Sequence, residues 1–69
     1  MVLAWAINER ARLYALEHRS KGASDEETVG YYKGYLDSAL MIYRSRGTRI
    51  AGEDSFKRYS SVDEMQKVD

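Results

Sequence analysis

A helix stop followed at once by a helix start constrains this chain more than any other feature. Gly22 can take the left-handed conformation that ends a helix, and Ser24 with Glu27 forms an S-x-x-E capping box that begins the next helix. Two helices joined by about three residues usually lie side by side and antiparallel. The pattern therefore predicts an all-α fold built on an antiparallel helical hairpin.

The length and the cysteine count limit how such a fold can be stabilised. A chain of 69 residues is one domain at most, and a domain of this size buries only about 60% of its unfolded surface. Without cysteine and with one histidine, the chain has no disulfide, thiolate metal site or multi-histidine site. Association with a partner remains as the stabiliser that small domains use.

The apolar periodicity predicts helices over about 2–20 and 25–46, with the second ending at Gly47. Residues 1–47 then form the hairpin, and residues 48–69 form a C-terminal arm. Ser61 and Glu64 repeat the S-x-x-E signal, which predicts a short helix over 62–67. Phe56 and Tyr59 are positioned to anchor the arm, either on the hairpin or on another molecule. Because an isolated helix this short is marginal in water, we expect the arm to be ordered only when docked.

The first helix carries two apolar stripes instead of one. The first stripe contains Val2, Trp5, Ala6, Leu13 and Leu16, and the second contains Leu3, Ile7, Ala11 and Tyr14. One antiparallel neighbour covers one stripe only. The second stripe is then exposed, covered by the arm, or packed against a helix from another subunit, and we favour the last interpretation.

The second helix has an apolar face that is wider than one neighbour requires. Its seam repeats every three or four residues, and further apolar residues widen it to nearly half the circumference. The seam contains Val29, Tyr32, Leu36, Ala39 and Tyr43, and the widening residues are Tyr31, Tyr35, Leu40 and Ile42. A stripe of this width suits a helix that packs against more than one neighbour.

Gly30 and Gly34 lie inside this second helix, where each costs roughly 1 kcal/mol relative to alanine. With Ser38 they form a ridge of small residues. The ridge indicates either a close helix crossing, in which another backbone or an aromatic ring approaches, or surface glycines that make room for the neighbouring tyrosines.

Six tyrosines and a group of basic residues suggest two kinds of contact. Tyrosine suits partly wet protein interfaces and can also stack on nucleic-acid bases, and the helical spacing favours core and interface. The basic group is a candidate phosphate-binding cluster, or else a set of solvated cations that pair with the acidic blocks 25–27 and 63–64. Its members are Arg44, Arg46, Arg49, Lys57 and Arg58.

No catalytic, metal-binding or cofactor-binding motif is present, and we expect no enzyme activity and no small-molecule substrate. His18 lacks the cysteines or carboxylates that would make it a ligand or a base, so it is interpreted as structural. A net charge of zero argues against a protein that coats nucleic acid. The apolar run at residues 2–7 is far shorter than the roughly 20 residues of a membrane span. We expect a soluble, intracellular protein.

The segment from Glu17 to Arg46 resembles small helical-hairpin proteins encoded by tailed bacteriophages. The resemblance rests on the charged first helix, the joint Lys-Gly-Ala-Ser-Asp-Glu-Glu and the run Tyr-Tyr-Lys-Gly-Tyr-Leu-Asp at residues 31–37. It implies a minor structural subunit of the virion, or a small protein that binds a host or phage factor, located in the host cytoplasm or the virion.

These observations favour a non-enzymatic assembly module that oligomerises or docks on a larger protein. A small inhibitor of a larger enzyme would need the same kind of surface. The alternative is a regulatory or nucleic-acid-associated binder that uses the basic cluster. The candidate partner-binding residues are Leu3, Trp5, Ile7, Tyr14, Gly30, Tyr31, Gly34, Tyr35, Ile42, Phe56 and Tyr59.

Overall fold

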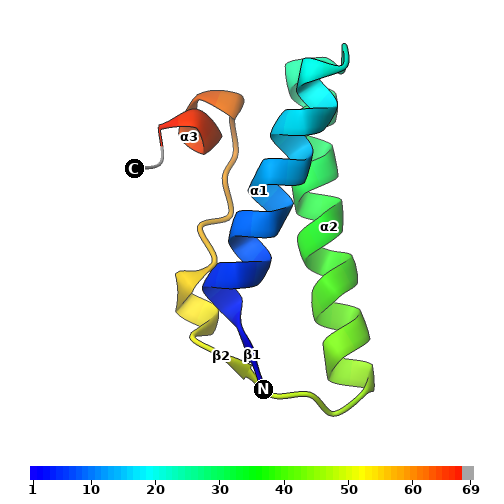
Figure 1. Cartoon of the computed structure of the whole chain (residues 1–69), viewed down its shortest axis with the longest axis vertical. Helices are drawn as coiled ribbons and strands as arrows, with labels where there is room; N and C mark the ends of the chain where they lie inside the picture. Colours follow the sequence, from blue (N-terminus) through cyan, green and yellow to red (C-terminus); the bar gives the residue numbers. More distant parts are fainter. Residues whose placement is uncertain (68–69) are drawn as a thin grey trace.

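The computed structural model describes residues 1–67 and confirms an all-α helical hairpin with a C-terminal arm (Figure 1). The chain runs through a short strand β1, the two long helices α1 and α2, a second short strand β2, a single 3-10 turn η1 and a short helix α3. Their bounds are Val2–Leu3, Ala4–Ser20, Asp25–Ser45, Ile50–Ala51, Glu53–Ser55 and Val62–Gln66.

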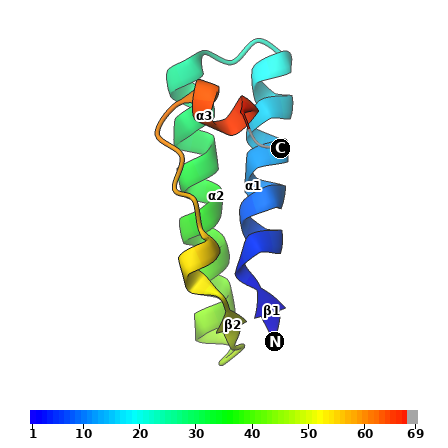
Figure 2. The same cartoon turned by 90° about the vertical axis from the view of Figure 1, so that its left-hand side faces the viewer.

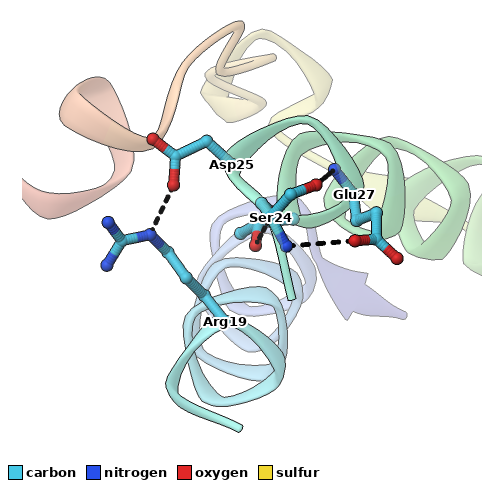
Figure 3. A network of polar contacts seen from close by, with 5 residues as sticks. Arg19, Ser24, Asp25 and Glu27 are labelled. Carbon is cyan, nitrogen blue, oxygen red and sulfur yellow. Dashed lines mark hydrogen bonds and ion pairs between the residues drawn. The ribbon is translucent and has the colours of Figure 1, made fainter. Parts of the chain in front are cut away.

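The joint between α1 and α2 has the geometry that its sequence predicts (Figure 3). Gly22 adopts a φ of +111°, a conformation that residues with a side chain rarely take. Ser24 Oγ accepts a hydrogen bond from the backbone N–H of Glu27, and the Glu27 carboxylate accepts one from the N–H of Ser24, at 3.1 Å each. An ion pair between Arg19 and Asp25, at 2.7 Å, also spans the joint. The helix stop and the helix start are both confirmed.

The first residues of the chain differ from the prediction, because Val2 and Leu3 form a strand and not the first turn of α1. β1 pairs in parallel with β2, with Val2 opposite Ile50 and Leu3 opposite Ala51. The backbone N–H of Val2 also donates to the carbonyl of Arg49 at 2.9 Å. This pairing satisfies backbone groups of the two segments, and it ties the start of the arm to the start of α1.

The arm packs along one side of the hairpin (Figures 1 and 2). Its large apolar side chains enter the same core as both long helices, and α3 begins at Ser61, whose hydroxyl accepts from the N–H of Glu64 at 3.2 Å. Of the two anchoring positions considered for Phe56 and Tyr59, the structure shows the hairpin. The arm residues in the core are Phe56, Tyr59, Val62 and Met65, and the α2 residues are Tyr32, Leu36 and Leu40.

Part of the second apolar stripe of α1, namely Ile7 and Ala11, faces this core. This corrects the prediction that the second stripe lies outside the hairpin core. Ala4, Ala11 and Ala15 are fully buried and Ile7 is 7% exposed, whereas Trp5 and Leu13 of the first stripe are 59% and 53% exposed. Alanines let two helices approach closely, so the core forms mainly on the alanine-rich side of α1, while Trp5 and Leu13 lie outside it. Within residues 1–67, neither long helix has a stretch that is long and apolar enough to cross a bilayer.

Candidate functional site

The hairpin has a groove between α1 and α2 on each side, and the arm fills one of them. The other groove carries large apolar side chains that the chain itself leaves in contact with solvent. Leu3, Tyr14, Tyr31 and Ile42 are 45%, 44%, 42% and 49% exposed, and Tyr35 between them is half-buried. We call these five residues the open face. All five are among the predicted partner-binding residues. Leu3 and Tyr35 line one hollow of the groove, Tyr14 and Tyr31 line another, and Ile42 follows Tyr35 by two turns of α2.

The open face follows the spacing of a helix-packing seam on both helices. On α1 the positions 7, 10, 14 and 17 alternate steps of three and four residues, and position 3 precedes them by four. On α2 the positions 31, 35, 38 and 42 do the same. Side chains with this spacing lie one above another along a helix. The α1 row faces the groove. The α2 side chains that line the groove together with α1 are Tyr31, Tyr35, Ala39 and Tyr43, and Ile42 lies beside them on the exposed flank of α2.

Two aromatic contacts join the rows across the groove. The rings of Tyr14 and Tyr35 have centroids 5.6 Å apart at an interplanar angle of 59°. The His18 ring stacks on Tyr31 with a centroid distance of 4.9 Å and an angle of 25°. Such pairs stabilise by about 0.5–1.5 kcal/mol beyond the apolar area that they bury. They hold the exposed rings in fixed positions, and they place His18 at the edge of the open face, where sequence reasoning did not expect it.

A hollow lies at the end of the open face near the N-terminus of α1. It has a volume of about 370 Å³ and is lined by Leu3, Ile7, Arg10, Tyr35 and Tyr43, together with Met1, Val2, Ala6 and Ala39. Arg10 is the charged residue of this lining. It is exposed and forms no ion pair with any residue in the range 1–67. A second depression, of about 310 Å³, lies on the outward side of α1 between Trp5, Leu13 and Tyr14.

Three of the predicted partner-binding residues belong to the chain's own core instead. Ile7, Phe56 and Tyr59 are 7%, 9% and 7% exposed, so they offer little surface to another protein. The Tyr59 ring packs against the Tyr32 ring at a centroid distance of 5.2 Å. These three assignments are corrected because the arm, folded back on the hairpin, occupies the place that a partner was expected to take.

Gly30 and Gly34 are exposed on α2 and do not mark a close helix crossing within the chain. A Cβ atom added at either position would meet no neighbouring atom within 4 Å. Neither glycine is needed for packing inside the described fold. Both lie beside the row of positions 31, 35, 38 and 42, on the side toward Met41, and so form no part of that row.

Two members of the predicted basic cluster, Arg44 and Arg58, lie apart on the surface. Arg44 pairs with Glu53 at 3.3 Å, and not with the acidic blocks at 25–27 or 63–64. Arg58 has its guanidinium 6.0 Å from the centroid of the Phe56 ring and lies beside Lys33 and Asp37. Asp37 is two turns of α2 before Arg44, about 10 Å along the axis. Arg58 therefore does not lie next to Arg44, and the prediction of one phosphate-binding cluster is wrong for this pair.

Asn8 is a buried polar residue that sequence reasoning missed, and it connects all three segments of the chain. It lies on α1 at 5% exposure, and its Oδ1 accepts hydrogen bonds from the Tyr32 hydroxyl of α2 and from the backbone N–H of Lys57, the latter at 3.1 Å. Burial raises the pKa of the Tyr32 hydroxyl above its ordinary value. The sequence signal that could have identified Asn8 is its place as a single polar residue on the alanine-rich side of α1.

Arg12 makes a second polar link from α1 to the arm. Its guanidinium donates to the carbonyl of Met65 at 3.0 Å and also pairs with Glu9. Together with the Asn8 contacts, this link fixes the arm at both its middle and its end. The arm is therefore part of the folded hairpin and leaves the open face uncovered.

Between residues 1 and 67, no three His, Cys, Asp or Glu side chains lie close enough to hold a metal ion. What the surface does offer is apolar and aromatic area on a fixed support. Comparison with protein-family models, with curated proteins and with solved structures finds no match to this chain.

Proposed function

We propose that this chain is a non-enzymatic protein–protein interaction module that buries its open face against another protein. One observation carries the proposal, namely that large side chains 42–49% exposed form a continuous row on one face of the hairpin. Contiguous apolar surface of this kind marks interaction sites in soluble proteins, whereas scattered exposed side chains do not. A small structural or assembly subunit is the role that such a surface serves.

The composition of the open face supports protein as the partner. Three of its five residues are tyrosines, which combine a large contact area with a polar tip and are enriched at partly wet interfaces. The rings are already paired across the groove, so little side-chain freedom is lost on binding. A minor subunit of a phage virion, which the sequence resemblance implies, is one setting for this role.

Site-specific photo-crosslinking in cells that naturally produce the chain tests the proposal. A benzophenone amino acid replaces Tyr31 on the open face or, as the matched control, Met41. Met41 is 67% exposed and precedes Ile42 by one residue, so it is turned about 100° around the helix away from the open face. Both positions present apolar surface on the same helix, and the control position is the more exposed of the two, at 67% against 42%.

We expect a discrete protein adduct from position 31 and none from position 41. Equal adducts from both positions would show nonspecific apolar contact and would refute the proposal. Failure to form any protein adduct at position 31 would refute it as well. An adduct with nucleic acid at that position would favour the alternative of a nucleic-acid-associated binder.

A further inference from the structure

We propose that the partner of the open face is a second copy of this chain, bound antiparallel about a two-fold axis beside Tyr14. In this arrangement Arg10 of each copy pairs with Glu17 of the other copy. The inference rests on the proposed function and names its partner. It is carried by the spacing of the charges along α1 and by the position of the hollow.

Arg10 and Glu17 lie on the same side of α1, seven residues apart, with Tyr14 between them. Seven residues span about 10.5 Å along a helix and return to nearly the same angle around it. A two-fold axis that runs beside α1, perpendicular to it and level with the midpoint between the two charges, brings each arginine opposite the other copy's glutamate. The central tyrosines of the two copies then face each other at the axis.

The ion pairs that these two residues make within one copy leave both available for such a pairing. Arg10 is exposed and without an ion pair among residues 1–67. Glu17 pairs with Lys21 at 3.2 Å, with 58% of the Glu17 side chain still exposed. A parallel arrangement of two copies would place Arg10 against Arg10 and Glu17 against Glu17. Like charges that face each other disfavour that register, so the pattern selects the antiparallel one.

The same two-fold axis also brings complementary parts of the two open faces opposite each other. The α2 side chains that line the groove carry no charge, and on α1 the cation beside Glu17 is Lys21. The stacked pair His18–Tyr31 lies at the joint end, and the hollow of about 370 Å³ lies at the other end. Under this two-fold axis, His18 of one copy lies opposite residue 9 of the other copy. Residue 9 is at the height on α1 at which the hollow begins. Each copy thus sets its aromatic pair against the partner's hollow.

Charge reversal in the purified full chain tests both the partner and the register. Sedimentation equilibrium over a concentration series compares the natural chain with Arg10→Glu, Glu17→Arg, an equimolar mixture of the two variants, and Lys33→Glu as the control. Lys33 is exposed on α2 beside Arg58, outside the open face. Circular dichroism of each variant verifies that the hairpin remains folded.

We expect the natural chain and Lys33→Glu to dimerise equally. Each open-face variant should dimerise roughly tenfold or more weakly, because its dimer places like charges opposite each other at two positions. The mixture is expected to form a heterodimer. In it, the glutamate introduced at position 10 of one variant faces the arginine introduced at position 17 of the other, while the second pair keeps its natural residues. Failure of the mixture to recover would overturn the register.

A natural chain that stays monomeric throughout the series would overturn self-association. That outcome is distinguishable from failure of the proposed function, because position 31 would still crosslink to a different protein. Absence of any protein adduct at position 31 would instead remove the proposed function and this inference together.

Discussion

Replacing Asn8 with alanine tests whether one buried amide holds the three segments of this chain together. Asn8 Oδ1 accepts from the Tyr32 hydroxyl and from the Lys57 backbone N–H, so the substitution removes the acceptor of two donors at once. The Tyr32 side chain is 0% exposed and has no access to water in exchange. Lys57 is exposed, and its N–H can turn to solvent at lower cost.

The expected loss follows from these two environments. A buried donor left without a partner costs about 1–3 kcal/mol, and the lost bond to Lys57 adds about 0.5–1.5 kcal/mol. We therefore expect Asn8→Ala to lower the free energy of unfolding by about 2–4 kcal/mol. In a domain of this size, that corresponds to a fall in Tm of roughly 8–30 °C. Total stability of about 3–10 kcal/mol makes the change a large fraction of the whole.

Urea unfolding followed by circular dichroism measures the loss, and a double-mutant cycle with Tyr32→Phe assigns it to the hydrogen bond. The double variant lacks both the Tyr32 hydroxyl and the Asn8 oxygen that accepts from it, so it should be less destabilised than the sum of the two single variants. Lys33→Ala on the exposed side of α2, outside the open face, serves as the control substitution. A loss below about 0.5 kcal/mol for Asn8→Ala, or strict additivity in the cycle, would refute the reasoning.

The caps, the glycines and the buried tyrosine make further predictions. Ser24→Ala removes the N-cap of α2 and should lower the free energy of unfolding by about 1 kcal/mol in urea unfolding, and an unchanged midpoint would contradict this. Hydrogen bonds from Ser24 lower the pKa of Glu27, and those from Ser60 lower the pKa of Glu64; both carboxylates therefore stabilise the fold above the ordinary pKa of 4.5, and stability should fall as the pH drops below it in an acid titration followed by circular dichroism. Gly34→Ala should raise stability by about 1 kcal/mol in thermal melts, since the added Cβ meets no atom, and a lower Tm would indicate a contact that the fold does not show. Burial raises the pKa of Tyr32, which favours the folded state below pH 10 and should make stability fall above it; the midpoint of urea unfolding should therefore decrease as the pH is raised above 10, and a constant midpoint would contradict this.

The elements of this fold that sequence reasoning predicted depend on residues close together in the chain. The capping serines lie three residues from the groups that they bind, and Gly22 acts on the helix directly before it. Such interactions are complete within one or two turns of backbone, so the pattern of residue types is sufficient to indicate them. The hairpin, its joint and the short third helix follow from these signals.

Contacts between distant residues were not predictable in the same way. Val2 pairs with Ile50, and Asn8 binds the backbone of Lys57, so each contact joins positions almost fifty residues apart. Neither the two-residue strands nor a single asparagine has a periodicity of its own. They form because the arm folds back along the hairpin, and that path depends on the complete core.

The predicted surface was right about the excess of apolar stripe and wrong for Ile7, Phe56 and Tyr59, which the core buries. Two stripes on α1 and a wide stripe on α2 are more than one antiparallel neighbour can cover, and an open row indeed remains at Leu3, Tyr14, Tyr31, Tyr35 and Ile42. Which stripe of α1 is buried depends on the volume of its side chains, and a count of apolar residues does not measure that volume. The buried alanines let α1 approach α2 closely, so Trp5 and Leu13 of the first stripe stay outside the core, while Leu16 packs against its edge.

The arm's position explains why only one groove remains open. Phe56, Tyr59 and Met65 fill the groove on one side, where Asn8 and Arg12 supply the polar contacts that fix the backbone of the arm. The opposite groove has no such pair of buried acceptor and donor among residues 1–67, and its tyrosines instead pair with aromatic rings across it while their hydroxyl ends can reach water. A surface built in this way tolerates solvent in the free chain and loses little freedom on binding. That combination is what a reversible contact with a second copy requires.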